Sequence, residues 1–483
     1  MPVLYIDIDS LRPDHVGCYG YEQPTTPNID ALAEDAVRFD RAYVASSPCM
    51  SSRAAFVSGR YGVNNGVVTH GPPGMTLHSP LTRHSYRWAG HDNVEEDYWT
   101  LPELFFQERI RTAAVSSFPR HPAPWFYHLW HEFHQPQEPE GGYFQTPRAE
   151  DVADIGLDIL DRTDDEEFFL YLQFWEPHDP YLRSPEEVEP FRDGPLPPYP
   201  TAEMLEEHTE WDAFRSPTDP GLDRSLTHCD YDHVENLDAL GEMLAGYDAE
   251  IHYADEHVGR VLDALRERGL YEETLIVVTA DHGEEFGEHG LYREHWGTHE
   301  GTQHVPLLVK PPASAGVDAG SREELVTNVD MAPTLADYAG LDAPAAWQGR
   351  SLRPLLEDDH GADANSDAGA DWREFVVLDH GQYTAQRAVR TDRYKYIRTY
   401  NPGMWGGVVP DEALYDLDAD PWEQDNVAAD HPDLVEDLRK RMTAWVEDHI
   451  GTEEDPLHAA AREGPEGLHR LYQQKGYDHW DGV

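Results

Sequence analysis

Cysteine, lysine and long apolar runs are all scarce in this sequence of 483 residues. The three cysteines, Cys18, Cys49 and Cys229, are too few for a disulfide framework, and their scarcity is typical of a reducing compartment. No apolar run is long enough to cross a bilayer, and the opening residues, MPVLYIDIDS, already predict a core strand with no signal peptide before it. We therefore expect a cytoplasmic protein that does not associate with membranes.

Basic residues are also scarce. The chain has 93 acidic and 36 basic residues, a formal net charge of -57, and its only lysines are Lys310, Lys395, Lys440 and Lys475. Binding to nucleic acid or to an anionic membrane needs a basic surface, so we expect neither partner. The acids are spread along the whole chain, which favours adaptation to molar intracellular salt, where the Debye length is about 3 Å. The alternative is an acidic mesophilic protein with an unusual surface.

What the chain does contain is an alternation of apolar strands and amphipathic helices. This alternation predicts an α/β fold with a large mixed, mostly parallel sheet flanked by helices. The predicted strands are Val3–Ile8, Phe39–Ala45, Arg111–Ser116, Glu167–Phe174, Thr274–Ala280 and Val305–Val309. Helices are predicted from Ile29 to Val37, over Leu101–Gln107, Val152–Leu160 and Tyr247–Leu265, and over Asp330–Ala339.

A second, smaller domain is predicted at the C-terminal end. From Glu357 to Asp371 the composition turns to Asp, Ala, Gly and Asn, which is typical of a linker. Beyond it, three short strands with tight turns predict a small antiparallel sheet, and Leu434–Trp445 predicts a final helix. We therefore expect an α/β catalytic domain over residues 1–360 and a C-terminal α+β subdomain over residues 372–483. The three strands are Phe375–Leu378, Gln386–Arg390 and Tyr394–Arg398.

The segment Ser46–Arg60, SSPCMSSRAAFVSGR, is the first candidate for chemistry. Serine and proline before Cys49 predict a loop that enters a helix, and a helix start favours an anionic group. Arg53 lies one turn further on, on the same side as Cys49. The pair therefore indicates a nucleophile that faces an anion. The alternative is a buried structural cysteine with a surface arginine.

Ligand-type side chains follow three of the predicted strands. Asp7 and Asp9 end the first strand, Asp281 and His282 follow Thr274–Ala280, and His178 follows Glu167–Phe174. The carboxyl ends of parallel strands meet at one edge of a sheet, where ligands bind. Carboxylates and an imidazole suit a hard or borderline divalent cation, which would lower the pKa of a nucleophile beside it.

These motifs together resemble those of the sulfatases of the alkaline-phosphatase superfamily, and the resemblance covers nearly the whole chain. It is carried by DSLRPDH at 9–15, GCYG at 17–20, CMSSR at 49–53 with SGR at 58–60, PHDPY at 177–181, DHGE at 281–284, and LYDL at 414–417 with DP at 420–421. The chain departs from the family pattern at three places. Ser10 stands where a second aspartate is usual, Ser51 where a proline is usual, and Ser117 where a lysine is expected. The candidates to replace the missing lysines are Arg120, Arg293, His121 or His295.

The resemblance implies a fold, a cofactor and a mechanism. It implies one bound Ca²⁺, with Mg²⁺ or Mn²⁺ as alternatives, held by Asp9, Cys49, Asp281 and His282, with Asp7 as a further candidate ligand. It implies that a formylglycine-generating enzyme oxidises Cys49 to formylglycine, whose hydrate attacks the sulfur of a sulfate ester. Asp281 would take a proton, Arg53 would steady the nucleophile and the sulfate, and His178 would bind sulfate or protonate the leaving alcohol. The substrate expected by analogy is a carbohydrate or small-molecule sulfate ester.

Two alternatives remain open from the sequence. A phosphodiesterase or phosphonate monoester hydrolase has the same scaffold and pairs a single first-motif aspartate with Asp-His, as Asp9 does here with Asp281 and His282. The other alternative is an inactive relative that only binds metal. All three hypotheses require distant loops to converge, so we expect residue 49 to lie within about 6 Å of the carboxylates of Asp9 and Asp281.

Overall fold

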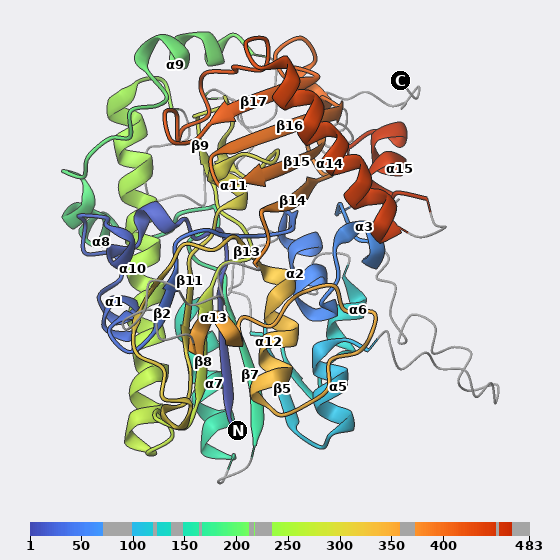
Figure 1. Cartoon of the computed structure of the whole chain (residues 1–483). Coiled ribbons are helices and arrows are strands. Elements are labelled where there is room, and N and C mark those ends of the chain that lie inside the picture. The colour runs from blue at the N-terminus through green and yellow to red at the C-terminus, as the bar shows by residue number, and fades with distance from the viewer. Residues whose placement is uncertain are drawn as a thin grey trace.

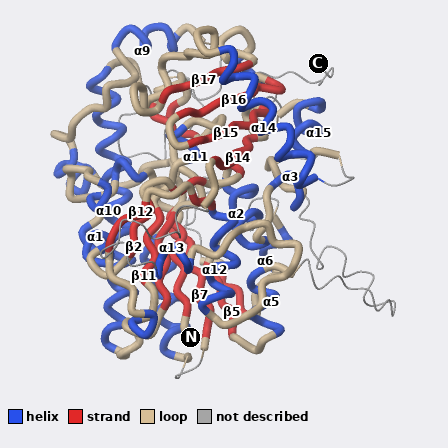
Figure 2. Tube along the Cα trace, viewed as in Figure 1, coloured by secondary structure: helices blue, strands red, loops and turns tan. Residues whose placement is uncertain are grey.

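The chain folds around a large central sheet (Figures 1 and 2). The computed structural model describes residues 1–70, 99–118, 123–136, 148–163, 167–211, 217, 234–357, 372–450 and 454–465. Within these residues the main sheet has eight strands in the order β12-β2-β11-β8-β1-β7-β5-β6. Their bounds are β1 Val3–Ile8, β2 Val37–Phe39, β5 Arg111–Val115, β6 Glu132–His134, β7 Phe168–Phe174, β8 Leu275–Thr279, β11 Leu307–Lys310 and β12 Gly320–Arg322.

The sheet is mixed and mostly parallel, which confirms the predicted fold class. β1 lies between β7 and β8 and is parallel to both, so that Asp7 is opposite Gln173 on one side and Thr279 on the other. β5 and β6 continue the parallel order, whereas β11 runs antiparallel to β8 and β2. The carboxyl ends of β1, β7 and β8 consequently meet at one edge, where their following loops can share a site.

Helices cover both faces of this sheet (Figure 1). α7 (Ala149–Asp161) packs on β7 and on the long helix α10 (Leu237–Glu267). α1 (Pro27–Ala33) also contacts α10. α2 (Cys49–Ser58), α5 (Leu101–Gln107) and α12 (Met331–Tyr338) contact one another in a second layer. The apolar sides of these helices and the central strands form one buried cluster, as amphipathic helices on a sheet must. The helices predicted over Leu101–Gln107, Val152–Leu160, Tyr247–Leu265 and Asp330–Ala339 are thus confirmed.

Two boundaries near the N-terminal end were predicted wrongly. The helix predicted to reach Val37 ends at Ala33, and Val37 begins β2 instead. The single strand predicted over Phe39–Ala45 is divided into the end of β2, β3 (Ala42–Tyr43) and β4 (Ser46–Ser47), which join three different sheets. β-Branched and aromatic residues favour a strand but do not determine its partner, because the partner comes from elsewhere in the chain.

The C-terminal residues form a second sheet above the first (Figure 1). Four antiparallel strands, β14 (Phe375–His380), β15 (Ala385–Thr391), β16 (Tyr394–Asn401) and β17 (Glu412–Asp416), confirm the predicted antiparallel sheet. A fifth strand was not predicted: β4 pairs in parallel with β14. α14 (Pro432–Ile450) and α15 (Pro456–Glu463) lie beside this sheet. The predicted linker and domain boundary fall largely in 358–371, outside the described residues.

The remaining elements are short and connect the two sheets or border them. They are α3 Gly62–Asn65, α6 Pro124–Tyr127, α8 Pro185–Val188, α9 Ala202–Thr209, α11 Glu300–Gln303, α13 Arg353–Glu357, β9 Glu285–Phe286, β10 Tyr292–Glu294 and β13 Val326–Thr327. No helix in the described part of the chain is both long enough and apolar enough to span a bilayer.

Candidate active site

Cys49 is the first residue of α2, directly after the loop from β4. The backbone N–H of Met50, one of the groups that a helix start leaves without an intrahelical partner, donates to Nε2 of His70 at 3.1 Å. All ten residues of α2 are buried, and the helix ends at Gly59, whose φ of 61° is in the left-handed region. Arg53 is only 1% exposed, so the alternative of a surface arginine is wrong.

The loops after β1 and β8 bring three further side chains to Cys49. One ligand atom each from Asp9, Cys49, Asp281 and His282 lie within 4.8 Å of one another, and all four residues are buried. The convergence predicted from the sequence, with a limit of about 6 Å, is therefore present. Asp7 is not part of this group, because its carboxylate is turned to Arg53 and Tyr171.

The guanidinium of Arg53 contacts three carboxylates of the site. Its Nε donates to Asp7 Oδ2 at 2.9 Å and its Nη2 to Asp9 Oδ2 at 2.9 Å, while Nη1 lies 2.7 Å from Asp281 Oδ2. The guanidinium also stacks over the ring of Phe118, 4.8 Å from its centroid. A planar fork with several donors suits this arrangement, in which one cation contacts three buried anions.

Burial and charge shift the titration of these groups. Burial alone would raise the pKa of Asp9, but the Arg53 guanidinium lowers it to about 2. Burial raises the pKa of Asp281 well above its ordinary value, and the Asp9 and Asp7 carboxylates raise it further, against the effect of Arg53. Burial, with Asp9 and Asp281 nearby, also raises the pKa of the Cys49 thiol. The thiol itself is therefore a poor nucleophile near neutral pH.

The residues of this group fit a divalent cation. Nδ1 of His282 lies 2.8 Å from the carbonyl oxygen of Gly283, which can only accept, so the proton is on Nδ1 and the lone pair is on Nε2. Nε2 lies 3.1 Å from Cys49 Sγ, whose thiol can donate to it, 3.3 Å from Asp281 Oδ2 and 3.8 Å from Asp9 Oδ1, so the lone pair points into the group of candidate ligands. Burial lowers the pKa of His282 to about 4, so the ring is neutral. Three aspartates and one arginine leave two negative charges, which a divalent cation would balance.

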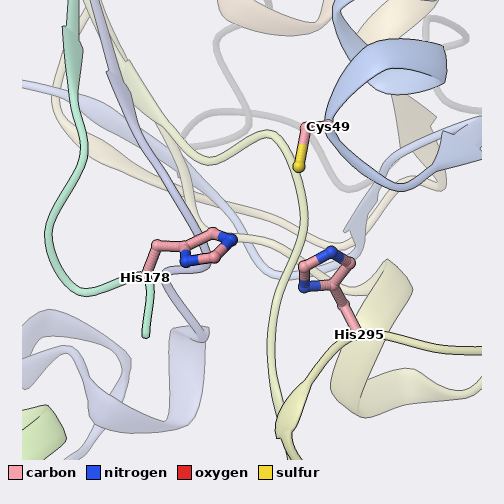
Figure 3. Close-up of side chains that lie close together, drawn as sticks. All are labelled: Cys49, His178 and His295. Carbon is pink, nitrogen blue, oxygen red and sulfur yellow. The ribbon is translucent and has the colours of Figure 1, made fainter. Parts of the chain in front are cut away.

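His178 and His295 also lie close to Cys49 (Figure 3). One ligand atom each from Cys49, His178 and His295 lie within 4.8 Å of one another. His295 also stacks against His282, with ring centroids 3.9 Å apart. Arg293, another expected replacement for a lysine, is buried beside Asp179, with Nη1 3.9 Å from Oδ1. Arg120 and His121 are outside the described residues.

Sequence reasoning missed two polar residues of β7 that hold the carboxylates. The hydroxyl of Tyr171 donates to Asp7 Oδ2, and Nε2 of Gln173 donates to Asp9 Oδ2 at 3.2 Å. A signal for them was present in the sequence. They interrupt an otherwise apolar strand at a spacing of two and therefore lie on one face of the sheet.

Carboxylates and an imidazole at the ends of β1 and β8, with a buried cysteine at the start of α2, are typical of a metal-binding hydrolase. Comparison with known proteins identifies the family. The Sulfatase family model matches residues 2–341, and a model described as N-sulphoglucosamine sulphohydrolase, C-terminal, matches residues 287–448. The chain belongs to the Sulfatase family and is a sulfuric ester hydrolase.

The relatives of this chain include sulfatases, and solved structures share its fold. The chain is 24% identical to the N-acetylglucosamine-6-O-sulfatase of Bacteroides thetaiotaomicron over 494 residues, which cover 88% of this chain and 82% of that protein. It superposes with a TM-score of 0.71 and 20% identity on a structure in complex with D-glucosamine-2-N,6-O-disulfate, covering 94% of this chain and 99% of the other. The phosphonate monoester hydrolase of Agrobacterium radiobacter gives a TM-score of 0.68 and 21% identity, with 93% and 96% covered.

Proposed function

We propose that the protein hydrolyses sulfate esters with a formylglycine derived from Cys49 and one divalent cation, Ca²⁺ or alternatively Mg²⁺ or Mn²⁺. The observation that supports this proposal is the convergence of Asp9, Cys49, Asp281 and His282 within 4.8 Å. These four residues would hold the cation. Two of the four offer hard carboxylate oxygens, and formylglycine at position 49 would add a third oxygen, which favours Ca²⁺.

The bound cation would stabilise negative charge on the sulfate and lower the pKa of the attacking hydroxyl. That hydroxyl would come from the hydrate of formylglycine at position 49. Asp281, which lies within reach of residue 49, would accept its proton. Arg53 positions the ligand carboxylates through its contacts with Asp9 and Asp281. His178, which lies close to residue 49, would donate a proton to the leaving alcohol.

His295 is our candidate for one of the missing lysines. It is 2% exposed and lies with His178 and Cys49 in one group, so it can donate a hydrogen bond to a sulfate oxygen bound there. A neutral imidazole gives one such donor, whereas a lysine gives three and a positive charge. We therefore expect sulfate to be held here by hydrogen bonds more than by net charge.

Conversion of Cys49 requires a formylglycine-generating enzyme as partner, which supplies the oxidant. Ser51 stands where proline is usual in the modified segment, and its hydroxyl donates to the carbonyl of Pro48 at 2.9 Å. The mass of the Cys49 peptide from the native host tests conversion directly. We expect the aldehyde or its hydrate. An unmodified thiol, together with a lack of sulfatase activity, would refute the proposal.

We infer a carbohydrate sulfate as the substrate class, because relatives with this fold include an N-acetylglucosamine-6-O-sulfatase. A small-molecule sulfate ester is the alternative. The scarcity of cysteine supports a cytoplasmic location, and the acidic composition argues against nucleic acid or membrane partners. Screening of sulfated monosaccharides with free sulfate as the readout tests the substrate class, and activity confined to non-carbohydrate esters would contradict it.

A second candidate function is hydrolysis of phosphodiesters or phosphonate monoesters. It is favoured by Ser10, which replaces the second aspartate and leaves Asp9 as the single ligand from the first motif. Rates on an aryl sulfate and on a matched aryl phosphodiester separate the two functions. A larger kcat/KM on the sulfate supports the main proposal. Turnover of neither ester, with metal still bound, would indicate an inactive metal-binding relative.

A further inference from the structure

Cys49 belongs to two groups of candidate ligands that share only its sulfur. The first contains Asp9, Asp281 and His282, and the second contains His178 and His295. Figure 3 shows the two rings of the second group facing one another beneath the Cys49 sulfur. The sulfur and one nitrogen of each ring lie within 4.8 Å of one another. The first group is rich in oxygen, whereas the second offers one sulfur and two nitrogens.

His178 is oriented as a metal ligand would be. Its Nδ1 lies 2.6 Å from the carbonyl oxygen of Asp179, an atom that can only accept a hydrogen bond. In the neutral ring the proton is therefore on Nδ1, and Nε2 carries a lone pair that can bind a metal. A hydrogen bond from the second ring nitrogen to a carbonyl is the usual way in which proteins fix a ligating histidine.

His295 has a similar environment. Glu284 Oε1 lies 3.5 Å from its Nδ1 and Glu294 Oε1 lies 3.2 Å from its Nε2, so either nitrogen can bind a cation while the other faces a carboxylate. Nδ1 makes no hydrogen bond within the described residues although the side chain is 2% exposed. A buried nitrogen without such a bond is costly unless a ligand occupies the space beside it.

We propose that the chain with an unmodified Cys49 binds Zn²⁺ through Cys49 Sγ, His178 and His295. One thiolate and two imidazoles are the ligands that zinc prefers, and they are poor ligands for Ca²⁺. Zinc–sulfur and zinc–nitrogen distances of about 2.3 Å and 2.0–2.1 Å place tetrahedral ligand atoms roughly 3.5 Å apart. Side-chain rotations that bring the three atoms about 1 Å closer together are sufficient to form this site. Three protein ligands leave a fourth position open, and the thiol proton leaves to solvent when zinc binds.

The zinc site and the proposed sulfatase site cannot be present in the same molecule at the same time. Conversion of Cys49 to formylglycine removes the sulfur, so the zinc site exists only before conversion. The inference rests on the proposed function only in that both use residue 49. A protein that never becomes a sulfatase would still bind zinc, so the two proposals can fail separately.

The test uses full-length protein in which the mass of the Cys49 peptide shows an unmodified thiol. Cobalt(II) replaces zinc as a coloured probe, because a cobalt–thiolate bond gives a charge-transfer absorption in the near ultraviolet. We expect this band to saturate at one cobalt per chain, to disappear on addition of Zn²⁺, and to persist in excess Ca²⁺. His178→Gln and His295→Gln each lower the cobalt affinity at least tenfold.

Two control variants identify the ligands. Asp281→Asn, which removes a ligand of the first group, retains the thiolate band. His208→Gln alters a buried histidine that is hydrogen-bonded to Tyr292 and belongs to neither group, and it also retains the band. Circular dichroism verifies that each variant is folded. X-ray absorption of the zinc-loaded wild-type protein needs no variant, and we expect one sulfur and at least two nitrogens around the metal.

Two results would overturn the proposal. One is a thiolate band that survives in both His178→Gln and His295→Gln but is lost in Asp281→Asn, which would assign Cys49 to the first group alone. The other is a zinc absorption spectrum with oxygen ligands and no sulfur.

Discussion

Replacement of Arg53 by methionine gives the sharpest test of how this site is held together. The side chain is buried and is the only cation within 4 Å of the three site aspartates among the described residues. Methionine keeps much of the volume and the contact with Phe118 but removes the charge. In the absence of metal, Asp7, Asp9 and Asp281 would then have no positive partner.

The expected loss is large. Removal of one partner of a buried ion pair costs about 3–5 kcal/mol, a substantial part of a typical free energy of unfolding of about 5–15 kcal/mol. A divalent cation should offset part of this loss, because Arg53→Met changes the formal charge of the site from -2 to -3. We expect the variant to bind Ca²⁺ at least tenfold more tightly than the wild-type protein, which corresponds to about 1.4 kcal/mol of extra stabilisation.

Urea denaturation, followed by the fluorescence of the 13 tryptophans, measures both effects with and without Ca²⁺. Arg387→Met is the matched control. Arg387 is also fully buried between two aspartates, with Nε 2.5 Å from Asp379 Oδ1 and Nη1 2.7 Å from Asp455 Oδ2, in the C-terminal sheet. Without metal, Arg387→Met should lose as much stability as Arg53→Met. Added Ca²⁺ should stabilise Arg387→Met no more than it stabilises the wild-type protein. Equal gains for both variants would refute the assignment of the cation to the Arg53 site.

Three further predictions concern leaving-group protonation, acid stability and salt. His178→Gln should lower kcat about 10²–10⁴-fold for an alkyl sulfate and far less for a nitrophenyl sulfate, because the nitrophenolate leaves without a proton. Equal losses for the two substrates would contradict the role of His178 as the proton donor. Burial alone would raise the pKa of Glu300, but Lys395 lowers it from 4.5 to about 2. The ionised form of Glu300 therefore stabilises the fold by on the order of 3 kcal/mol above pH 4.5, and this stabilisation is lost as the pH falls through 2. The difference in stability between wild type and Glu300→Gln should therefore shrink between pH 5 and pH 2, and a constant difference would contradict this account. The melting temperature should rise between roughly 0.1 M and 3 M KCl, because salt screens the net charge of -57, and a flat curve would count against adaptation to high salt.

Much of the fold could be predicted from local patterns. Val3–Ile8 and Thr274–Ala280 were identified because a strand buried on both faces is apolar almost throughout, and the structure places β1 and β8 side by side. The candidate ligands Asp9, Asp281 and His282 could be proposed because they follow such strands directly. The carboxyl ends of parallel strands meet at one edge, so a position along the sequence implied a position in space.

Contacts between distant segments were decided only by the tertiary structure. The sequence suggested that Arg53 faces an anion, but not that it contacts three aspartates from two strand ends. His295 could only be guessed as a replacement for a lysine, and the folded chain sets it against His282 and within reach of Cys49. β4 became part of the C-terminal sheet by pairing with β14, more than 300 residues further along the chain.

The sequence by itself therefore determined which residues are chemically competent and at which strand ends they lie, since apolar periodicity and ligand chemistry are local properties. Only the tertiary structure determined which of these residues lie next to Cys49. Side-chain direction and loop closure depend on packing between elements that no local pattern encodes. As a result the same cysteine lies close both to an oxygen-rich group and to two histidines.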